Sequence, residues 1–455
     1  MQKLVIRLTF GIVSRMTNSR MPSTAIPLRE QVRVASATRT LNSLSRLGRR
    51  FGDPFGAFDA PGGPFDHEEL HQSLIKAGPL VKSRFGVYLT PTHAGCHAVF
   101  TSPHASSMVA RPQSTIGRLL EPTLRTSLGS PFDTWFISMD APDHTRLRRL
   151  VQRGFTPKAI ADHAALVRRT ADELIDAFPT HGDVDLVASF ARLLPMRVIT
   201  RLLGVPDSDF ATFDRWGEHL VVALDRPRSL RDARNVHITF IEIDKMFRKL
   251  IAERRRHPGD DLISVLAEKV DGDLLSDDEL VGTLSLLLIA GFETTVNLIG
   301  AGTATLVTNR DQLELLASNP EMHLANTVEE ALRYESPVQF TLRRTLAPIE
   351  IEESHVIPAG VDVITVLTTA NRDPLVFDDP QKFDITRPNS RRHLAFVNGP
   401  HACIGGALAR LETQVAWESL INHFPDISRW RTTSAPTLGP SQIIRGFKHL
   451  PMRFA

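Results

Sequence analysis

Apolar residues recur at intervals of three and four positions through most of the chain between residues 140 and 340. The segments Ile160–Phe178 and Phe240–Arg254 show this spacing, which is typical of helices that bury one face. Three later segments instead alternate apolar and polar residues, as β-strands do: Ile349–Ile351, Val361–Leu367 and Gln442–Phe454. The pattern therefore predicts a mainly α protein with a small β region.

One segment is apolar on nearly every side. The 30 positions from Leu280 to Asn309 hold a single charged residue, Glu293. A helix of this length could cross a bilayer, but hydroxyl side chains are spread along it and its acid lies near the middle. We therefore expect a helix buried in the centre of the protein, where a carboxylate has to be paired or functional.

Composition excludes several classes of protein. The 455 residues are 42% hydrophobic and 23% charged, which is ordinary for a globular protein and argues against disorder, collagen or a coiled coil. The 53 basic and 51 acidic residues give a net charge of +2, which does not indicate a nucleic-acid partner. Two cysteines, Cys96 and Cys403, are too few for a disulfide scaffold or a four-cysteine metal site. They fit a reducing, cytoplasmic location.

The chain shows no internal repeat, and its Pro- and Gly-rich stretches at 52–64 and 387–399 contain apolar residues throughout, as structured loops do. We expect one domain over residues 41–455. Residues 1–40 are expected to be a disordered leader or the product of a start codon placed too early, because Met16 and Met21 also offer starts. A targeting peptide is the alternative, since the first 29 residues hold five basic side chains and no acid.

The strongest local signal is Cys403, in a turn-forming loop that leads directly into a helix. The loop reads Phe396-Val-Asn-Gly-Pro-His-Ala-Cys-Ile-Gly405, and apolar Leu408, Leu411 and Val415 follow it. A thiol at a helix N-terminus is expected to have a lowered pKa, and such a thiolate is a good iron ligand that loop N–H groups can tune. A lone cysteine is more often a small buried hydrophobe. The loop alone leaves both interpretations open.

The loop is similar to the haem-binding signature of the cytochrome P450 family, Phe-Gly-x-Gly-x-His/Arg-x-Cys-x-Gly. Four more segments, in the family's order and spacing, resemble its other signatures over residues 65–455, and the likeness is to soluble, actinobacterial-type members. Val397 stands where the family usually has glycine. The resemblance implies the cytochrome P450 fold, with haem b between the long central helix and the cysteine-loop helix, and Cys403 as the metal ligand. In the loop it implies these further haem-binding residues: Phe396, Gly399, His401 and Gly405.

The second segment is Ala290-Gly291-Phe-Glu293-Thr294-Thr, in the middle of the long apolar helix. It resembles the family's oxygen-activating stretch. The likeness implies that Ala290 and Gly291 lie against the cofactor, and that Glu293 and Thr294 relay protons. The alternatives are a structural salt bridge for Glu293 and hydrogen bonding of Thr294 to a carbonyl of its own helix.

Two further segments resemble structural parts of the family. One, at 370–374 and 383–387, resembles the meander before the cysteine loop, and the other contains Glu330 and Arg333. Glu330 and Arg333 share a helix face, and the resemblance implies a buried charge pair that serves folding and cofactor retention.

Four basic residues are implied as partners of the haem propionates, because basic donors suit carboxylates. They are His144, Arg148, Arg343 and His401. Spacing to Glu350 selects Arg343 over its neighbour Arg344.

The function that the resemblance implies is that of a haem-thiolate monooxygenase, inserting one oxygen atom from O2 into a hydrophobic small molecule. The chain has no dinucleotide or flavin motif, so electrons are expected from a separate ferredoxin and its NAD(P)H-dependent reductase. Four arginines are candidates for a ferredoxin dock, or are simply solvated: Arg149, Arg153, Arg391 and Arg392.

The expected substrate-lining segments are Gly86–Phe132, Pro206–His237, Leu284–Thr294, Pro337–Thr341 and Gln442–Ile444. Their apolar residues favour a hydrophobic substrate. Two alternatives stay open. A peroxide-driven hydroxylase of the same family typically lacks the Glu293–Thr294 pair, and a non-catalytic haem-binding sensor would not need it.

Overall fold

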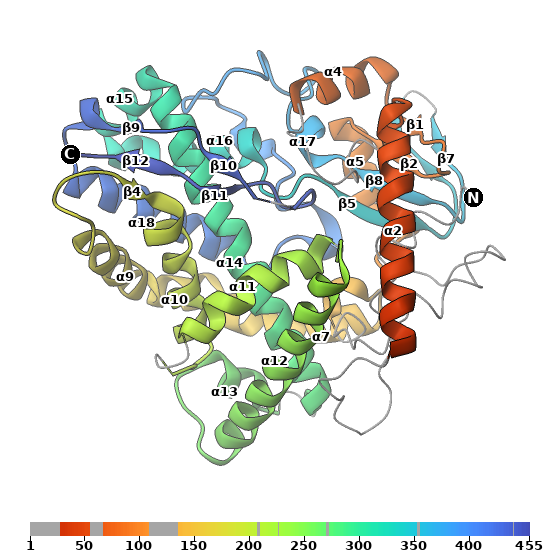
Figure 1. The fold of residues 1–455 in the computed structure, drawn as a ribbon, viewed down its shortest axis with the longest axis horizontal. Helices are drawn as coiled ribbons and strands as arrows, with labels where there is room; N and C mark the ends of the chain where they lie inside the picture. Colours follow the sequence, from red (N-terminus) through yellow and green to blue (C-terminus); the bar gives the residue numbers. More distant parts are fainter. Residues whose placement is uncertain are drawn as a thin grey trace.

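The computed structural model describes residues 28–54, 67–108, 135–206, 210–225, 227–269, 273–352, 355–439 and 441–455. Helices form most of this structure, with small sheets at its edges (Figure 1). The helices are α2 (Leu28–Arg50), α4 (His67–Ala77), α5 (His93–Thr101), α7 (Asp143–Gln152), α8 (Pro157–Asp162), α9 (Ala164–Asp176), α10 (Leu193–Leu202), α11 (Phe210–Asp225), α12 (Leu230–Arg256), α13 (Leu262–Ala267), α14 (Asp277–Thr308), α15 (Arg310–Ser318), α16 (Pro320–Glu335), α17 (Leu367–Ala370) and α18 (Gly406–His423). The mainly α prediction is confirmed.

The strands belong to one five-stranded sheet and three smaller ones. The larger sheet has the order β1 (Val81–Lys82), β2 (Tyr88–Thr90), β8 (Asp362–Thr365), β5 (Thr341–Thr345), β3 (Ala105–Ser106). Only β2 and β8 are parallel in it. The smaller sheets are β4 (Val184–Asp185) with β12 (Pro451–Arg453) and β9 (Arg431–Thr432), β10 (Thr437–Leu438) with β11 (Phe447–His449), and β6 (Ile349–Glu350) with β7 (Val356–Ile357).

The β region agrees with the alternating segments but differs in its pairing. Ile349 pairs with Ile357 in the β6–β7 hairpin, whereas the segment at Val361–Leu367 supplies β8, which pairs with β5. The sequence pattern did not indicate β5, because its adjacent Arg343 and Arg344 interrupt the alternation. Among residues 442–446, only Ile444 forms a bridge, to Val338.

The predicted helices are present, but one of them is divided into two. The segment at Ile160–Phe178 forms two helices, α8 and α9, which meet at His163. Thr156 begins the first of them by accepting a hydrogen bond from the N–H of Ala159, and Pro157 occupies the first helical turn, where a missing N–H costs nothing. The segment at Phe240–Arg254 lies wholly inside α12.

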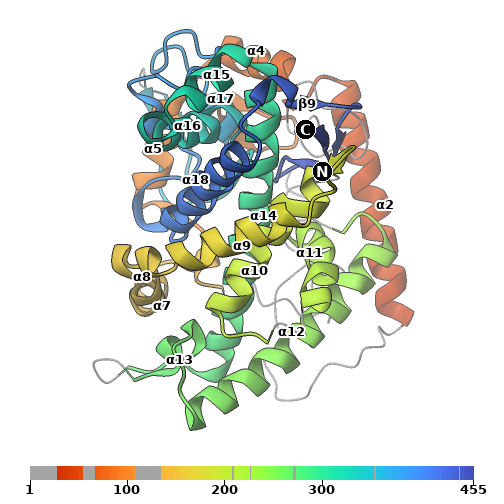
Figure 2. The same ribbon diagram turned by 90° about the vertical axis from the view of Figure 1, so that its left-hand side faces the viewer.

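The long apolar segment forms α14, which runs through the middle of the molecule (Figures 1 and 2). Its start is fixed by a capping box, in which Ser276 and Glu279 each bond the other's backbone N–H. It contacts α10, α12, α16 and α18. It is the one described helix long and apolar enough to cross a membrane, yet 83% of its most apolar window is buried inside the protein. The expectation of a buried central helix is confirmed.

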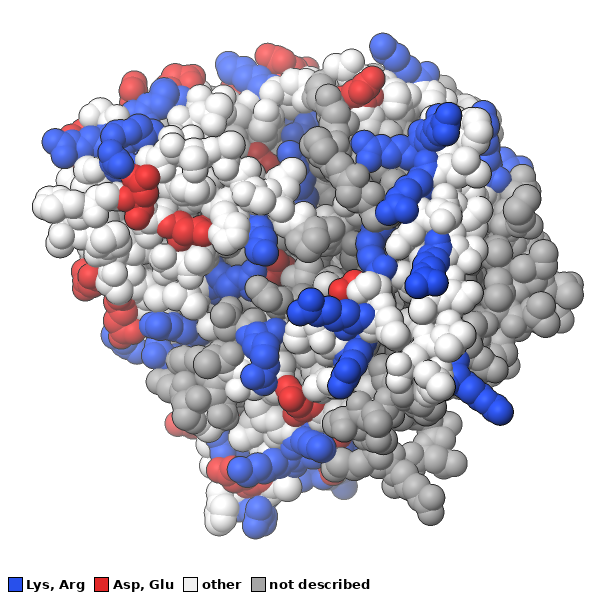
Figure 3. All heavy atoms as spheres, viewed as in Figure 1, with Lys and Arg blue, Asp and Glu red and all other residues white. Residues whose placement is uncertain are grey.

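The first described element, α2, runs along one side of the molecule (Figure 1). Its Val34 packs against Ala233 of α12. On this face Lys and Arg side chains follow the helix (Figure 3). The expected boundary at residue 40 falls inside α2, since this helix begins at Leu28. The expectations for residues 1–27, and for most of the loop at 52–64, lie outside the described residues.

Candidate active site

The cysteine loop is held by short backbone hydrogen bonds. The N–H of Cys403 donates to the carbonyl oxygen of Phe396 at 2.9 Å, and the N–H of Ala402 donates to that of Gly399 at 3.1 Å. Gly399 has φ +73°, and a Cβ there would lie 2.4 Å from the carbonyl oxygen of Phe100. Glycine is therefore required at position 399 by both conformation and space.

Val397 is the residue that departs from the family's loop pattern, and the structure shows its consequence. Its φ of 49° is in the left-handed region, which a β-branched residue rarely enters. Its side chain packs beside Cys96 and Phe100. Valine thus occupies a conformation suited to glycine, and the loop keeps that conformation.

The side chain of Cys403 is solvent-accessible, but enough protein surrounds it for burial to dominate its pKa. Burial raises the pKa of this thiol, while the N–H groups of Gly405 and Gly406 and the charges of Arg148 and Arg410 lower it. The expectation of a net lowered pKa is wrong for the protein alone, because desolvation outweighs the helix terminus. A bound metal ion would remove the thiol proton outright.

The middle of α14 has an exposed stretch within an otherwise buried helix. Ala290 is exposed and Gly291 and Thr294 are partly exposed, although the helix is buried over 280–289 and 295–303. These three residues lie on one face, because positions i and i+4 are neighbours on a helix. Glu293 is buried. The Thr294 hydroxyl donates to the carbonyl oxygen of Ala290 at 3.0 Å, so the helix-internal hydrogen bond considered for it is present.

The four basic residues expected to bind propionates gather at one place. The rings of His144 and His401 stack with centroids 3.9 Å apart. Arg148 donates to the carbonyl oxygen of Ala402, next to Cys403, at 2.5 Å. Burial, and then the nearby His144, Arg343 and Arg148, lower the pKa of His401 to about 3. The pKa values of His144 and Arg148 are also lowered, mainly by burial.

The two neighbouring arginines of β5 have different partners. Arg344 pairs with Asp362 at 2.9 Å across the β5–β8 ladder. Arg343 lies in the basic cluster, with its guanidinium 5.7 Å from the ring centre of Phe100, and burial lowers its pKa to about 10. Among described residues it forms no ion pair.

The basic cluster forms no ion pair with any residue that the structure describes. The acid whose charge acts on His144 and Arg343, Asp140, accepts hydrogen bonds from the Ser106 hydroxyl and the Ser107 N–H instead. The buried Nε2 of His144 has no hydrogen-bond partner among the residues described. Several basic groups without counter-charge beside an accessible thiol suit a cofactor that brings two carboxylates and a metal ion. The residues present therefore fit haem.

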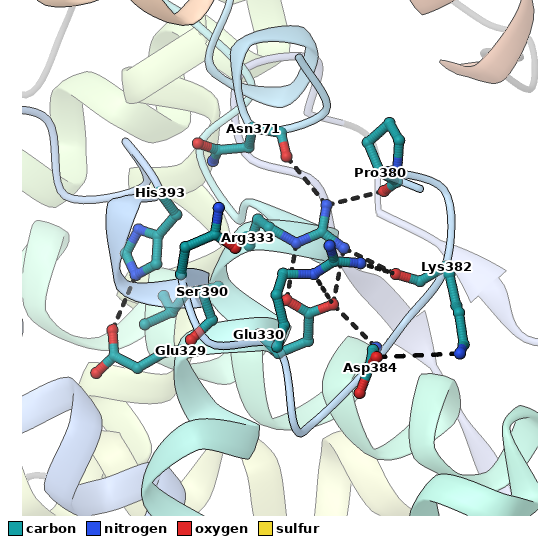
Figure 4. Close-up of polar contacts among 12 residues, drawn as sticks. Glu329, Glu330, Arg333, Asn371, Pro380, Lys382, Asp384, Ser390 and His393 are labelled. Carbon is teal, nitrogen blue, oxygen red and sulfur yellow. Dashed lines mark hydrogen bonds and ion pairs between the residues drawn. The ribbon is translucent and has the colours of Figure 1, made fainter. Parts of the chain in front are cut away.

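Glu330 and Arg333 of α16 are fully buried. Arg333 donates from Nε and Nη2 to the two carboxylate oxygens, each at 2.8 Å. A second guanidinium, that of Arg387, donates from Nε to Oε1 of Glu330 at 3.1 Å. Figure 4 shows the other donors of Arg333 directed at the carbonyl oxygens of Asn371, Pro380 and Lys382. The expected buried pair is confirmed, and it ties α16 to the segment before the cysteine loop.

A second carboxylate connects α16 to the loop itself. Glu329 accepts from Arg410 at 2.6 and 3.0 Å and from His393 at 3.0 Å. Burial would raise its pKa, but these hydrogen bonds hold it at about 2. Arg410 also lies over the Phe396 ring, at 4.6 Å. Glu329 thus positions the loop through Arg410.

Sequence reasoning missed Arg387, Glu329 and Glu412. Glu412 is buried on α18 beside Thr295 of α14, and burial raises its pKa to about 8. A signal for it was available, since an acid interrupts the apolar face of the helix after Cys403. The partners of Arg387 and Glu329 are distant in sequence, so no local pattern marks them.

Comparison with known proteins gives the family. A model of the family described as Cytochrome P450 matches residues 66–425. The chain is 39% identical to Cytochrome P450 107B1 of Saccharopolyspora erythraea over 362 residues, covering 77% of this chain and 85% of that protein. The chain belongs to the cytochrome P450 family. It is 35% identical to Putative cytochrome P450 140 of Mycobacterium tuberculosis over 426 residues, covering 90% and 94% of the two chains.

Solved structures agree. P450BioI, in its complex with an acyl carrier protein carrying hexadec-9Z-enoic acid, matches with a TM-score of 0.77 at 30% identity, over 86% of this chain and 99% of that chain. The protein is therefore a cytochrome P450 monooxygenase with the P450 fold, and its bacterial relatives indicate a haem-iron oxidoreductase.

Proposed function

We propose that this P450 holds haem b with Cys403 as the thiolate ligand and with His144, Arg148, Arg343 and His401 around the propionates. The observation that carries the proposal is the basic cluster, which has no anionic partner among the described residues. Arg148 of this cluster donates to the carbonyl oxygen of Ala402, next to Cys403. Bound haem supplies the activation of O2 and the transfer of one oxygen atom to the substrate. The chain supplies the ligand, the propionate donors and the proton path.

Thr294 and Glu293 are the proposed proton carriers. The Thr294 hydroxyl donates to the carbonyl oxygen of Ala290, so its own oxygen keeps lone pairs that can accept from water at this partly exposed position. Glu293 is adjacent and buried, a position in which a carboxyl can exchange a proton with few competing solvent paths. Ala290 and Gly291 keep this face of α14 free of large side chains, which leaves room for O2 and substrate.

A hydrophobic small molecule is the proposed substrate. Relatives include a steroid C26-monooxygenase of Mycobacterium tuberculosis and a 6-deoxyerythronolide B hydroxylase of Saccharopolyspora erythraea, 37% and 40% identical to this chain. Phe340, Val338 and Ile444, from two of the expected lining segments, are apolar and lie together where the Val338–Ile444 bridge joins the segments. Residues 109–132 of a third segment lie outside the described residues.

Electrons are proposed to come from a separate ferredoxin and its NAD(P)H-dependent reductase. All four candidate docking arginines are exposed, and Arg391 and Arg392 form no ion pair with another described residue. Arg149 and Arg153 lie 3.7 and 3.8 Å from the carboxylates of Asp273 and Glu268, which reduces the positive charge they present. The pair at 391–392 is therefore the better candidate for the dock.

The proposal is tested by turnover under labelled dioxygen. Apolar compounds that shift the haem absorption band on binding are supplied with a surrogate ferredoxin, reductase and NADPH. We expect product that carries one labelled oxygen atom and that requires the ferredoxin. Product formed equally well from hydrogen peroxide without electron donors would favour the peroxide-driven alternative. Absence of product with every compound that shifts the band would contradict the monooxygenase reaction.

A further inference from the structure

Helix α2 presents an unusual surface, because apolar and basic side chains are exposed together along it. Twelve large hydrophobic residues are exposed in the described parts of the chain, and four of them lie within or directly after α2. They are Leu28, Val32, Leu47 and Phe51, which are 75%, 62%, 49% and 57% exposed. Such exposure in one short region marks an interaction surface.

The charges on this surface are of one sign. The α2 sequence holds six arginines and one acid, Glu30. The exposed members are Arg29, Arg39, Arg46, Arg49 and Arg50, and none forms an ion pair with another described residue. Figure 3 shows Lys and Arg side chains spaced along this side of the molecule among uncharged surface. The surface therefore attracts anions over the length of α2.

Two neighbouring segments extend the basic surface. Asp53, just after α2, accepts hydrogen bonds from the hydroxyl of Ser83 and the N–H of Arg84, at 2.9 and 2.6 Å. Arg84 in the β1–β2 turn is exposed, and so is Arg231 at the start of α12, which contacts α2. The C-terminal end of α2 is thus tied to the β1–β2 region through Asp53, and the helix packs on α12 with its basic and apolar side chains exposed.

We propose that this face of α2 docks the protein on the surface of an anionic lipid bilayer. Arginines interact with lipid headgroup phosphates while apolar side chains between them enter the boundary of the acyl region, and both kinds of residue share this face. The preceding segment has the same character, since the first 29 residues contain no acid. A dock on an acidic protein would use the arginines but would not need exposed apolar residues at both ends of the helix.

The test uses the full-length, haem-loaded protein in vesicle flotation. Vesicles contain phosphatidylcholine alone or mixed with phosphatidylglycerol. We expect flotation only with the mixed vesicles, and less of it as salt is added. The triple variant Arg39→Glu/Arg46→Glu/Arg50→Glu should lower the bound fraction about tenfold or more, because each reversal removes an attraction and adds a repulsion.

The matched control reverses three exposed basic residues elsewhere: Arg169→Glu/Lys249→Glu/Arg256→Glu. It should bind vesicles as the unmodified protein does. The haem absorption spectrum of each variant shows that the site is intact. Failure of the unmodified protein to float with anionic vesicles would overturn the proposal, as would equal losses in the two triple variants. Full binding by Leu47→Ser/Phe51→Ser would overturn the role given to the apolar side chains.

Discussion

At the scale of single residues, the site combines a few side chains in unfavourable situations. Val397 has a left-handed backbone, the pKa of Cys403 is raised by burial, and Arg343 is half-buried without a described ion pair. Each situation costs free energy in the protein alone. Bound haem would reduce the costs at Cys403 and Arg343. The cost at Val397 comes from the conformation of the loop backbone and would remain.

The strain at Val397 is measurable by comparing two substitutions. Val397→Ala and Val397→Gly both remove the methyl groups, but only glycine is relaxed at a φ of 49°. We expect Val397→Gly to be more stable than Val397→Ala by about 1 kcal/mol, the reverse of the usual order of these residues. Urea unfolding of the two variants provides the measurement. A more stable alanine variant would show that position 397 is not strained.

Thr294→Ala removes the hydroxyl proposed to pass protons. We expect product formed per NADPH consumed to fall at least about threefold while NADPH is still oxidised, because an undelivered proton diverts electrons from product. Thr308→Ala is the control, since Thr308 makes the same kind of hydrogen bond to a carbonyl at the far end of α14. Unchanged coupling in Thr294→Ala would contradict the relay.

Glu412 predicts a pH dependence of stability. Its folded-state pKa of about 8 is above the ordinary value, so between about pH 4.5 and 8 the unfolded chain loses a proton that the folded protein keeps. This group therefore lowers the free energy of unfolding as pH rises through that window. Between these pH values, we expect the free energy of unfolding of Glu412→Gln to rise relative to that of the unmodified protein, by up to about 1.4 kcal/mol for each pH unit. Parallel stability curves for the two proteins would contradict this.

At the scale of elements, α16 holds the cysteine loop in place. Two adjacent acids of this helix form ion pairs with arginines from three parts of the chain. Glu330 pairs with Arg333 and Arg387, and Glu329 pairs with Arg410. The sequence indicated the i, i+3 pair because both partners lie on one helix. It could not indicate Arg387 or Arg410, since contacts between residues distant in sequence depend on the tertiary fold. The same reason hid the pairing of β5 with β8.

Breaking this network should destabilise the protein. Glu330→Gln leaves two buried guanidinium groups without their carboxylate, so we expect the free energy of unfolding to fall by about 3–5 kcal/mol. Asp426→Asn is the control, because it breaks an exposed pair with Arg429 and should leave the free energy of unfolding nearly unchanged. Urea unfolding and the haem content of purified protein provide the readouts. Equal effects of the two substitutions would show that the network is not a support.

At the scale of the whole molecule, the fold class and the central helix followed from the hydrophobic pattern, and the site residues from local motifs. The exposure of Ala290 within a buried helix, and the lack of an ion pair between the described residues and His144 or Arg343, appear only in three dimensions. The sequence pattern also did not indicate the basic and apolar face of α2. Which of its residues are exposed depends on which side of the helix packs on α12. Exposure, unlike periodicity, requires the neighbouring elements to be known.

The central claim is that Cys403 binds haem iron as a thiolate. The most direct test is the absorption spectrum of fresh, folded protein after reduction with dithionite and exposure to carbon monoxide. We predict a strongly red-shifted Soret band, and its absence in Cys403→Ser. A Soret band at the position typical of histidine-ligated haem in the unmodified protein, or no haem band at all, would contradict the account.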